Sequence, residues 1–308
     1  MSKLSKTGAL LAAGVLTTGL LTTAPAAARQ DTTAAATAAC RISAGAMTAG
    51  GDHRIQTFAS TRPITRTENR TIAKGLWPAN RVRLSSSWFK GRGEENPEIN
   101  HSGLVVDVEN TLYDGQYAVV SDGIAAHWQR AGWGWGGYRA VERSRVLLTA
   151  TTERQTGYGL APDGTLRRWN LIPDNGRQIW RASGSATGYA GVKSMALISQ
   201  TKTYDTFLMN ARDGALLTVR IPTSSPMKPV VKRVRTSTWQ VFETMLGARC
   251  GNYGTLLLGI DKDTRAGYLY AVGHGATVIQ GLGKVPGTFP DPVNFAWRNY
   301  SDPLLFGE

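Results

Sequence analysis

The sequence predicts an all-β protein, a five-bladed β-propeller built from repeats of about 50 residues. Three observations lead to this prediction. Aromatic residues recur at a nearly fixed interval, glycine turns separate short apolar runs within each interval, and no segment after the N-terminal apolar run keeps a helical period. Short strands that are joined by turns and repeated at this interval are typical of propeller blades.

The repeat is marked by aromatic residues 51, 50 and 50 positions apart, namely Tyr138, Tyr189, Trp239 and Phe289. Trp88 lies 50 positions before Tyr138, where a first unit would begin, although its surroundings match the others poorly. An apolar run follows several residues after an aromatic, as in residues 146–150, 195–199 and 244–248. Because the marked positions vary only among aromatics, we expect their rings to pack between neighbouring blades.

Each unit also contains a predicted β-hairpin with a glycine turn. The turns are predicted at Asp122-Gly123, Asp163-Gly164 and Asp213-Gly214, and Gly267 takes the corresponding place without an aspartate. Glycine supplies the left-handed backbone conformation that such turns need. The apolar runs on both sides of each turn are therefore predicted to be the two strands of a hairpin.

The last unit, from about residue 283 to residue 308, is roughly half as long as a blade. We expect its missing strands to come from the N-terminal region around Ile55 to Ile64, so that the last blade is closed by the N-terminal segment. A ring that closes in this way leaves no exposed sheet edge. The propeller is predicted to span residues 51–308.

The N-terminus has the order of a secretory signal peptide, with Lys3 and Lys6 before an apolar run and small residues up to Ala28. We therefore predict a signal peptide over residues 1–28 and a secreted, extracellular protein. A membrane anchor is the alternative, but a span requires about 20 apolar residues. No later segment approaches that length, so we expect no membrane span in the mature chain. Residues 29–50 begin with an alanine- and threonine-rich stretch and are predicted to be a disordered lead-in.

Cys40 and Cys250 are the only cysteines. In an oxidising compartment, two thiols that are distant in sequence are expected to form a disulfide, whereas a metal site would need about four ligands. We therefore predict a Cys40–Cys250 bond, which would tie the start of the mature chain to a late segment.

The formal net charge is +13, of which Lys3 and Lys6 in the signal peptide contribute two. The remaining Arg and Lys residues are scattered, with their densest group at residues 228–235. Outside a cell, an anionic cell-surface polymer is a more available partner for a basic protein than nucleic acid, so we expect no nucleic-acid partner. The alternative is dispersed charge that only keeps the protein soluble.

The sequence gives no positive sign of an enzyme. It contains no H-E-x-x-H, G-x-S-x-G, P-loop or C-x-x-C pattern. Its histidines are too scattered for a metal cluster: His53, His101, His127 and His274. An acidic cluster in an insertion, Glu94, Glu95 and Glu98, offers paired carboxylates for glycoside cleavage, but a solvated loop is the alternative. We therefore predict no catalytic residues, no metal and no cofactor.

Together these features resemble the tachylectin family of five-bladed propeller lectins. The resemblance rests on the glycine-rich run at residues 128–141, the turn at residues 162–166 and the segment at residues 266–272, and it covers roughly residues 88–295. It implies a secreted, enzymatically inactive ring that binds N-acetylated sugars in several equivalent pockets between blades. The family's glycine-glycine-aromatic signature is complete only at Gly136-Gly137-Tyr138, so we expect fewer working sites than blades.

The segment "GWGWGGY", residues 132–138, holds the leading ligand candidates. Trp133 and Trp135 alternate with glycine, which would place both rings on one side of an extended segment, and we find no counterparts for them in the other units. An exposed aromatic face suits the apolar C–H side of a sugar ring, and glycine lets the backbone approach a ligand. The further predicted ligand-binding residues are Tyr138, Asp163, Trp169 and Asp213.

Each of these candidates also has a structural interpretation. The two tryptophans would then pack over a blade edge, Tyr138 would belong to the core, and Trp169 would be part of the second strand of a hairpin. Asp163 and Asp213 would serve their own turns, as aspartate before glycine usually does.

The predicted function is carbohydrate binding by a secreted, non-catalytic propeller that recognises cell-envelope or environmental glycans, N-acetylated sugars among them. One alternative is a protein-interaction subunit of an exported assembly that has lost its sugar pockets. The other is a polysaccharide-degrading propeller enzyme, whose acidic pair the sequence does not identify.

Overall fold

The computed structural model describes residues 39–92, 99–149 and 151–308, which belong to one compact unit, Ala39–Glu308. Strands dominate these residues, beside the short 3₁₀ helices η1 (Trp239–Val241) and η2 (His274–Ala276). The all-β class is therefore confirmed. No helix in the described part of the chain is long and apolar enough to cross a membrane. The predicted signal peptide, residues 1–28, lies outside the described residues.

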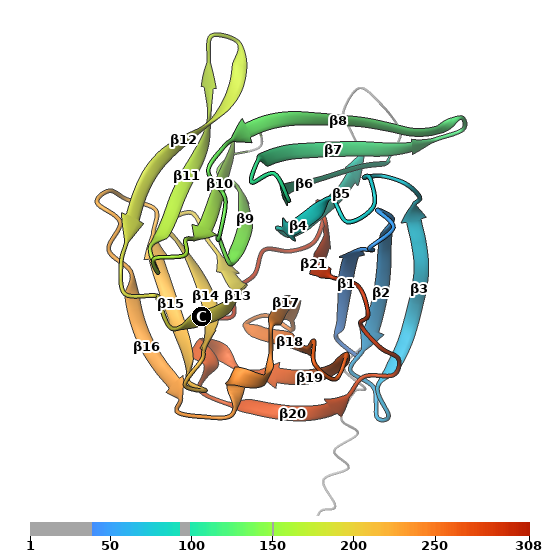
Figure 1. The fold of residues 1–308 in the computed structure, drawn as a ribbon. Coiled ribbons are helices and arrows are strands. Elements are labelled where there is room, and N and C mark those ends of the chain that lie inside the picture. Colours follow the sequence, from blue (N-terminus) through green and yellow to red (C-terminus); the bar gives the residue numbers. More distant parts are fainter. Residues whose placement is uncertain (1–38, 93–98, 150) are drawn as a thin grey trace, which may run out of the picture. The chain divides into compact units, whose positions relative to one another are not determined.

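One sheet of nine strands joins the two ends of this unit (Figure 1). Its order is β3-β2-β1-β21-β5-β6-β7-β8, and β4 pairs with β6. Strand β21 pairs antiparallel with β1 and parallel with β5. The strands are β1 (Arg41–Met47), β2 (His53–Ala59), β3 (Thr65–Ala73), β4 (Val82–Ser85), β5 (Trp88–Arg92), β6 (Ile99–Asp107), β7 (Leu112–Val120), β8 (Gly123–Gly132) and β21 (Val293–Asn299).

The rest of the chain forms three antiparallel sheets of four strands, each in sequence order. The first contains β9 (Ala140–Leu147), β10 (Glu153–Leu160), β11 (Leu166–Asp174) and β12 (Arg177–Ala186). The second contains β13 (Val192–Gln200), β14 (Tyr204–Ala211), β15 (Leu216–Pro222) and β16 (Val230–Arg235). The third contains β17 (Thr244–Cys250), β18 (Gly254–Asp261), β19 (Ala266–Val272) and β20 (Ile279–Lys284).

Within the unit, the sheets stand around a common centre (Figure 1). The outermost strands are β3, β8, β12, β16 and β20, while β9, β13, β17 and β21 face the centre. Neighbouring sheets bury apolar faces against each other. Tyr158 on β10 and Phe207 on β14, for example, are fully buried with ring centroids 5.0 Å apart. The core therefore consists of apolar layers between neighbouring sheets, because each sheet must bury its apolar faces against another element.

A repeated backbone contact accounts for the aromatic landmarks. The segment that connects each outermost strand to the following part of the chain donates one N–H to a carbonyl in an earlier hairpin turn, at 2.9–3.1 Å. The donor and acceptor pairs are Trp77 and Gly51, Trp135 and Asn110, Tyr189 and Gly164, Trp239 and Gly214, and Phe289 and Arg265. Every acceptor residue has a positive φ, and every donor's aromatic side chain is buried. We call this interaction the docking contact.

The docking contact corrects the predicted repeat in the first half of the chain. Trp135, and not Tyr138, is the counterpart of Tyr189, and Trp77 takes the place that Trp88 was predicted to have. The Tyr138 N–H donates instead to the carbonyl of Trp135, at 3.2 Å. The intervals from Trp77 to Trp135 and from Trp135 to Tyr189 are 58 and 54 residues. A fixed period of 50 residues therefore places the landmarks of these two units wrongly.

The predicted hairpin turns are right in part. Asp163-Gly164 joins β10 to β11, and Asp213-Gly214 joins β14 to β15. Asp122-Gly123 also joins two strands, β7 and β8, but this is the third hairpin of its group, whereas the docking turn lies in the second, between β6 and β7. Gly267 lies inside β19, where a Cβ would come within 2.4 Å of the Phe289 ring. That glycine therefore makes room for a landmark ring and does not form the turn.

The predicted lead-in, residues 29–50, is wrong for residues 41–47, which form β1. Small residues stand in this strand because large rings lie against it. A Cβ on Gly45 would come within 2.2 Å of the Phe295 ring on β21, and Ala44 and Ala46 are buried. The prediction of disorder rested on the preceding alanine- and threonine-rich stretch, whereas residues 41–47 form a close contact with the C-terminal strand β21.

The Cys40–Cys250 disulfide is confirmed, with Cα atoms 5.3 Å apart across 210 residues of sequence. It links the residue before β1 to the last residue of β17. The bond therefore holds the N-terminal strand to a different sheet from the one in which it is hydrogen-bonded.

The double variant Cys40→Ala/Cys250→Ala is expected to lose about 2–4 kcal/mol of unfolding free energy, because the bond restricts the unfolded chain. Denaturant unfolding of the oxidised parent and the variant measures this difference. Reduction of the parent should reproduce it, and unchanged midpoints in both experiments would contradict a stabilising bond.

Candidate functional site

The loop between β8 and β9 carries the two tryptophans of the "GWGWGGY" segment. Gly134 and Gly137 have φ values of +77° and +73°, so the backbone reverses and is not extended. The two rings consequently do not share one side. Trp133 is 74% exposed, whereas Trp135 is only 5% exposed.

Trp135 is part of the core, which corrects its prediction as a ligand-binding residue. Its ring lies 4.4 Å from the Tyr138 ring and 5.0 Å from the Trp169 ring, between centroids. Tyr138 is buried as well, as its packed interpretation predicts, and Trp169 is half-buried beside it. The Arg83 guanidinium donates to the carbonyls of both Trp135 and Tyr138. These contacts fix the loop at its base.

Trp133 is held on the outside of this anchored loop. The guanidinium carbon of Arg130 on β8 lies over its ring, 5.5 Å from the centroid. An arginine at this distance restrains the ring without covering both faces. An exposed aromatic face on a fixed loop is therefore the part of the predicted site that remains available to a ligand.

The two predicted aspartates serve their turns. Asp163 accepts the Thr165 N–H at 2.8 Å, which holds the pKa of its carboxyl below the usual value. Asp213 accepts the Ala215 N–H at 3.0 Å and lies 3.9 Å from Arg233. The equivalent docking turns at Asn110 and Arg265 have no aspartate-glycine pair. The contacts of Asp163 and Asp213 thus lie within their own turns and give no sign of a ligand site.

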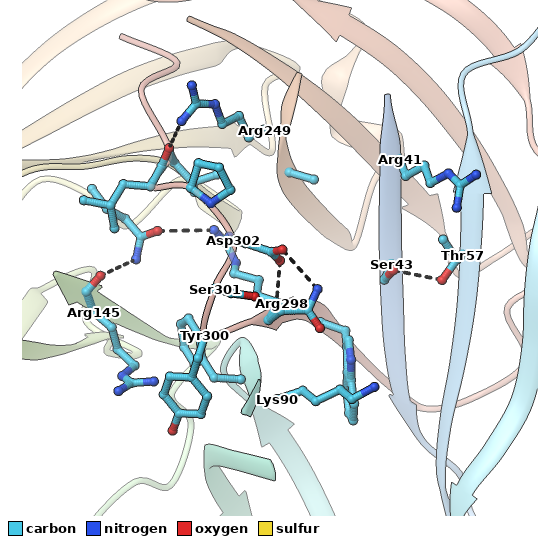
Figure 2. Close-up of a pocket in the computed structure, with 18 of the residues that line it drawn as sticks. Arg41, Ser43, Thr57, Lys90, Arg145, Arg249, Arg298, Tyr300, Ser301 and Asp302 are labelled. Atoms are coloured by element: carbon cyan, nitrogen blue, oxygen red, sulfur yellow. Dashed lines mark hydrogen bonds between the residues drawn. The ribbon is translucent and has the colours of Figure 1, made fainter. Parts of the chain in front are cut away.

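A cavity of about 980 Å³, which no sequence pattern predicted, lies at the centre of the unit. We call it the central cavity. It is lined by residues of β1, β2, β3, β5, β9, β10, β13, β17 and β21, by Gly251 and by the segment at residues 300–305 (Figure 2). Residues that are far apart in the sequence thus meet around one space, in the size range of ligand pockets.

The lining of the central cavity is rich in cations. Six cationic side chains face three carboxylates there: Arg41, Arg70, Lys90, Arg145, Arg249 and Arg298 against Glu68, Glu153 and Asp302. Five of the lining residues follow the repeat, one on each of β5, β9, β13, β17 and β21, at intervals of 55, 55, 49 and 49 residues: Lys90, Arg145, Gln200, Arg249 and Arg298. This spacing was the available sequence signal.

A smaller cavity of about 230 Å³ lies at the opposite ends of the central strands. Its Glu142 carboxyl is fully buried, which raises its pKa, and it accepts the N–H groups of Ser87 and Arg143 at 2.8 and 2.7 Å. Burial lowers the pKa of Lys262 to about 8, and its Nζ donates to the Asp291 carbonyl at 2.6 Å. These contacts join neighbouring strands and give both groups a structural role.

The described residues form no metal site. Within residues 39–92, 99–149 and 151–308, no three His, Cys, Asp or Glu side chains come together as a metal site requires. The acidic cluster Glu94, Glu95 and Glu98 lies outside the described residues.

Alanine variants of Trp133 and Trp135 should differ in stability, because only Trp135 is buried. Trp135→Ala is expected to lower the unfolding free energy by about 3–5 kcal/mol, the range for deletion of a buried large aromatic. Trp133→Ala should stay within about 0.5 kcal/mol of the parent, because its ring is exposed. Denaturant unfolding of both variants checks this, and equal losses would contradict the assignment.

Comparison with known proteins supports the fold. No protein-family model and no curated protein matches the chain. Among solved structures, the fungal lectin of Aleuria aurantia, a six-bladed β-propeller, shares 10% sequence identity over 85% of each chain, with a TM-score of 0.50. A lectin from Burkholderia pseudomallei is similar over 80% of this chain and 70% of its own, at 17% identity and a TM-score of 0.42. The likeness to the Aleuria lectin shows that this chain shares the β-propeller fold.

Proposed function

We propose that this protein is a carbohydrate-binding, lectin-like propeller of five blades, secreted and non-catalytic, as its resemblance to tachylectins implies. The docking contact supports the number of blades, because it occurs five times among the described residues. The nine-stranded sheet then counts as two blades, β21-β1-β2-β3 and β5-β6-β7-β8, joined by the parallel pairing of β21 with β5. The disulfide fits an oxidising compartment.

The observation that carries the carbohydrate assignment is the exposed ring of Trp133 on its anchored loop. Trp135, Tyr138 and Arg83 hold the loop from below, so little conformational freedom is lost when a ligand covers the ring. The C–H face of a sugar offers apolar surface to an aromatic face, and the Arg130 guanidinium beside it can donate to hydroxyl groups. The pair is therefore suited to a saccharide ring.

Two sugars are the first to test. The resemblance to tachylectins points to N-acetylated sugars, and the Aleuria aurantia structure is described as showing a mode of fucose recognition. At 10% identity, the likeness to that lectin supports the fold and not the sugar that is bound. N-acetylated sugars and fucosides are therefore tested side by side. A protein-interaction subunit remains the alternative function and predicts no sugar binding.

Trp133→Ala is expected to weaken binding of the best sugar by about 1–3 kcal/mol, by analogy with the stacking of bases on aromatic side chains. Trp133→Phe should recover part of this loss, because it keeps an aromatic face. Titration calorimetry measures both, with the sugar chosen on a glycan array that includes N-acetylated sugars and fucosides.

Tyr253→Ala is the matched control, since Tyr253 is also an exposed aromatic, 63% accessible, in the turn between β17 and β18. It should bind like the parent. If the array shows no sugar, or if the Trp133 and Tyr253 variants lose affinity equally, the assignment of this site is wrong.

A further inference from the structure

The central cavity contains cations whose charge the described part of the protein leaves unbalanced. Glu153 pairs with Arg145, and Glu68 pairs with Arg70 at 2.8 Å. The third carboxylate, Asp302, accepts the backbone N–H and the side-chain amide of Asn299, at 2.7 and 3.0 Å. Two of the three carboxylates in the lining are thus paired with a lining cation, and the three together cannot balance six cations.

Arg41, Arg249 and Arg298 have no carboxylate within 4.0 Å among the described residues. Arg249 donates to the carbonyls of Gly251 and Leu304, at 2.8 and 3.2 Å. Neutral acceptors satisfy donors but leave the positive charge in place. The cavity therefore presents excess positive charge to whatever enters it.

Arg298 is the most buried of these three cations. It is 8% exposed and lines the cavity, and its guanidinium donates only to neutral acceptors: the Gly247 carbonyl at 3.1 Å, the Leu197 carbonyl at 3.5 Å and the Gln200 side-chain oxygen at 3.4 Å. Its Nε has no hydrogen-bond partner among the described residues. Burial lowers the pKa of Arg298 and the charges of the Glu142 and Asp302 carboxylates offset this only in part, so an anion in the cavity would stabilise the charged guanidinium further.

The neutral lining suits a saccharide. Ser43, Thr57 and Ser301 bring hydroxyl groups to the wall (Figure 2), and the Ser43 and Thr57 hydroxyls are hydrogen-bonded to each other at 2.8 Å. The Tyr300 ring stands beside the Arg145 guanidinium, whose carbon lies 3.7 Å from the ring centroid. A volume near the upper end of the roughly 300–1,000 Å³ of small-molecule sites fits a short oligosaccharide.

We propose that the central cavity binds an acidic oligosaccharide, with sugar carboxylates received by Arg298, Arg41 and Arg249 in its lining. The proposal takes from the proposed function only that the ligand is a saccharide, and Trp133 is not among the lining residues of this second site. A planar guanidinium can donate two parallel hydrogen bonds to a carboxylate, which makes arginine the suitable residue for this group.

The test is titration calorimetry of the full chain with oligogalacturonate and with its methyl ester, in which the carboxylates are neutral. We expect binding of the acid, binding of the ester at least tenfold weaker, and affinity for the acid that falls as salt rises from low to moderate concentration. A sulfated oligosaccharide and an oligothymidylate are titrated beside them. Equal binding of acid and ester, or tighter binding of the sulfated sugar or the oligonucleotide, would overturn the proposal.

Variants place the binding in the cavity. Arg41→Gln/Arg249→Gln should weaken oligogalacturonate binding roughly tenfold, because charged hydrogen bonds are lost. The control Arg177→Gln/Arg181→Gln removes the same charge from exposed positions on β12 and should bind like the parent. Equal losses in the two double variants would show attraction to the general positive charge and overturn the site.

The two proposals fail separately. Trp133→Ala should leave oligogalacturonate binding unchanged, and Arg41→Gln/Arg249→Gln should leave binding of the neutral sugar unchanged. Arg298→Gln is a further variant if it folds. If it does not, the double variant alone decides whether the cavity holds the acidic sugar.

Discussion

The docking contact is the interaction on which the rest of the structure depends. A chain that leaves the outer edge of one sheet and returns to the centre has an N–H group with no strand partner, and burial makes an unpaired N–H costly. A turn residue with a positive φ provides the carbonyl that accepts this N–H. Gly164 accepts from Tyr189 in this way, and Gly214 accepts from Trp239. The same step buries a ring and fixes the start of the next sheet.

The C-terminal strand joins the two ends of the unit. Strand β21 pairs with β1 on one edge and with β5 on the other. The N-terminal strands β1 to β3, the C-terminal strand β21 and the strands β5 to β8 therefore form one sheet. The chain beyond it also returns to β13, where the Gly307 N–H donates to the Ile198 carbonyl and the Gln200 N–H donates to the Leu305 carbonyl, both at 2.9 Å. Long-range pairing of this kind, with the disulfide, leaves the ends of the unit held at several points.

The sequence predicted the second half of the repeat well, because Tyr189, Trp239 and Phe289 are 50 residues apart and all make the docking contact. The first half was misaligned, since longer intervals precede Tyr189 and Asn110 replaces glycine in the docking turn. Trp133 and Trp135 could not be told apart, because each stands between glycines. Only the reversal at Gly134 sends one ring outward and the other into the core. The five cavity residues that follow the repeat lie 49 or 55 residues apart, but only the positions of the strand ends show that they face one space.

A second arginine, whose side chain is 12% exposed, shows how the fold balances a charge between two sheets. Arg154 donates to both oxygens of Asp205 at 2.8 Å, and the Tyr158 hydroxyl donates to the same carboxylate at 2.7 Å. This cluster joins two sheets and balances its charge within the protein. Arg298 is more deeply buried and donates to neutral oxygens alone, as does Arg168 on β11, which reaches the Pro222 and Ser224 carbonyls of another sheet. Arg168 lies between two sheets, whereas Arg298 lines an open cavity together with five further cations. The surplus of positive charge around that open space, and not the neutral acceptors by themselves, is what an anion from outside would balance.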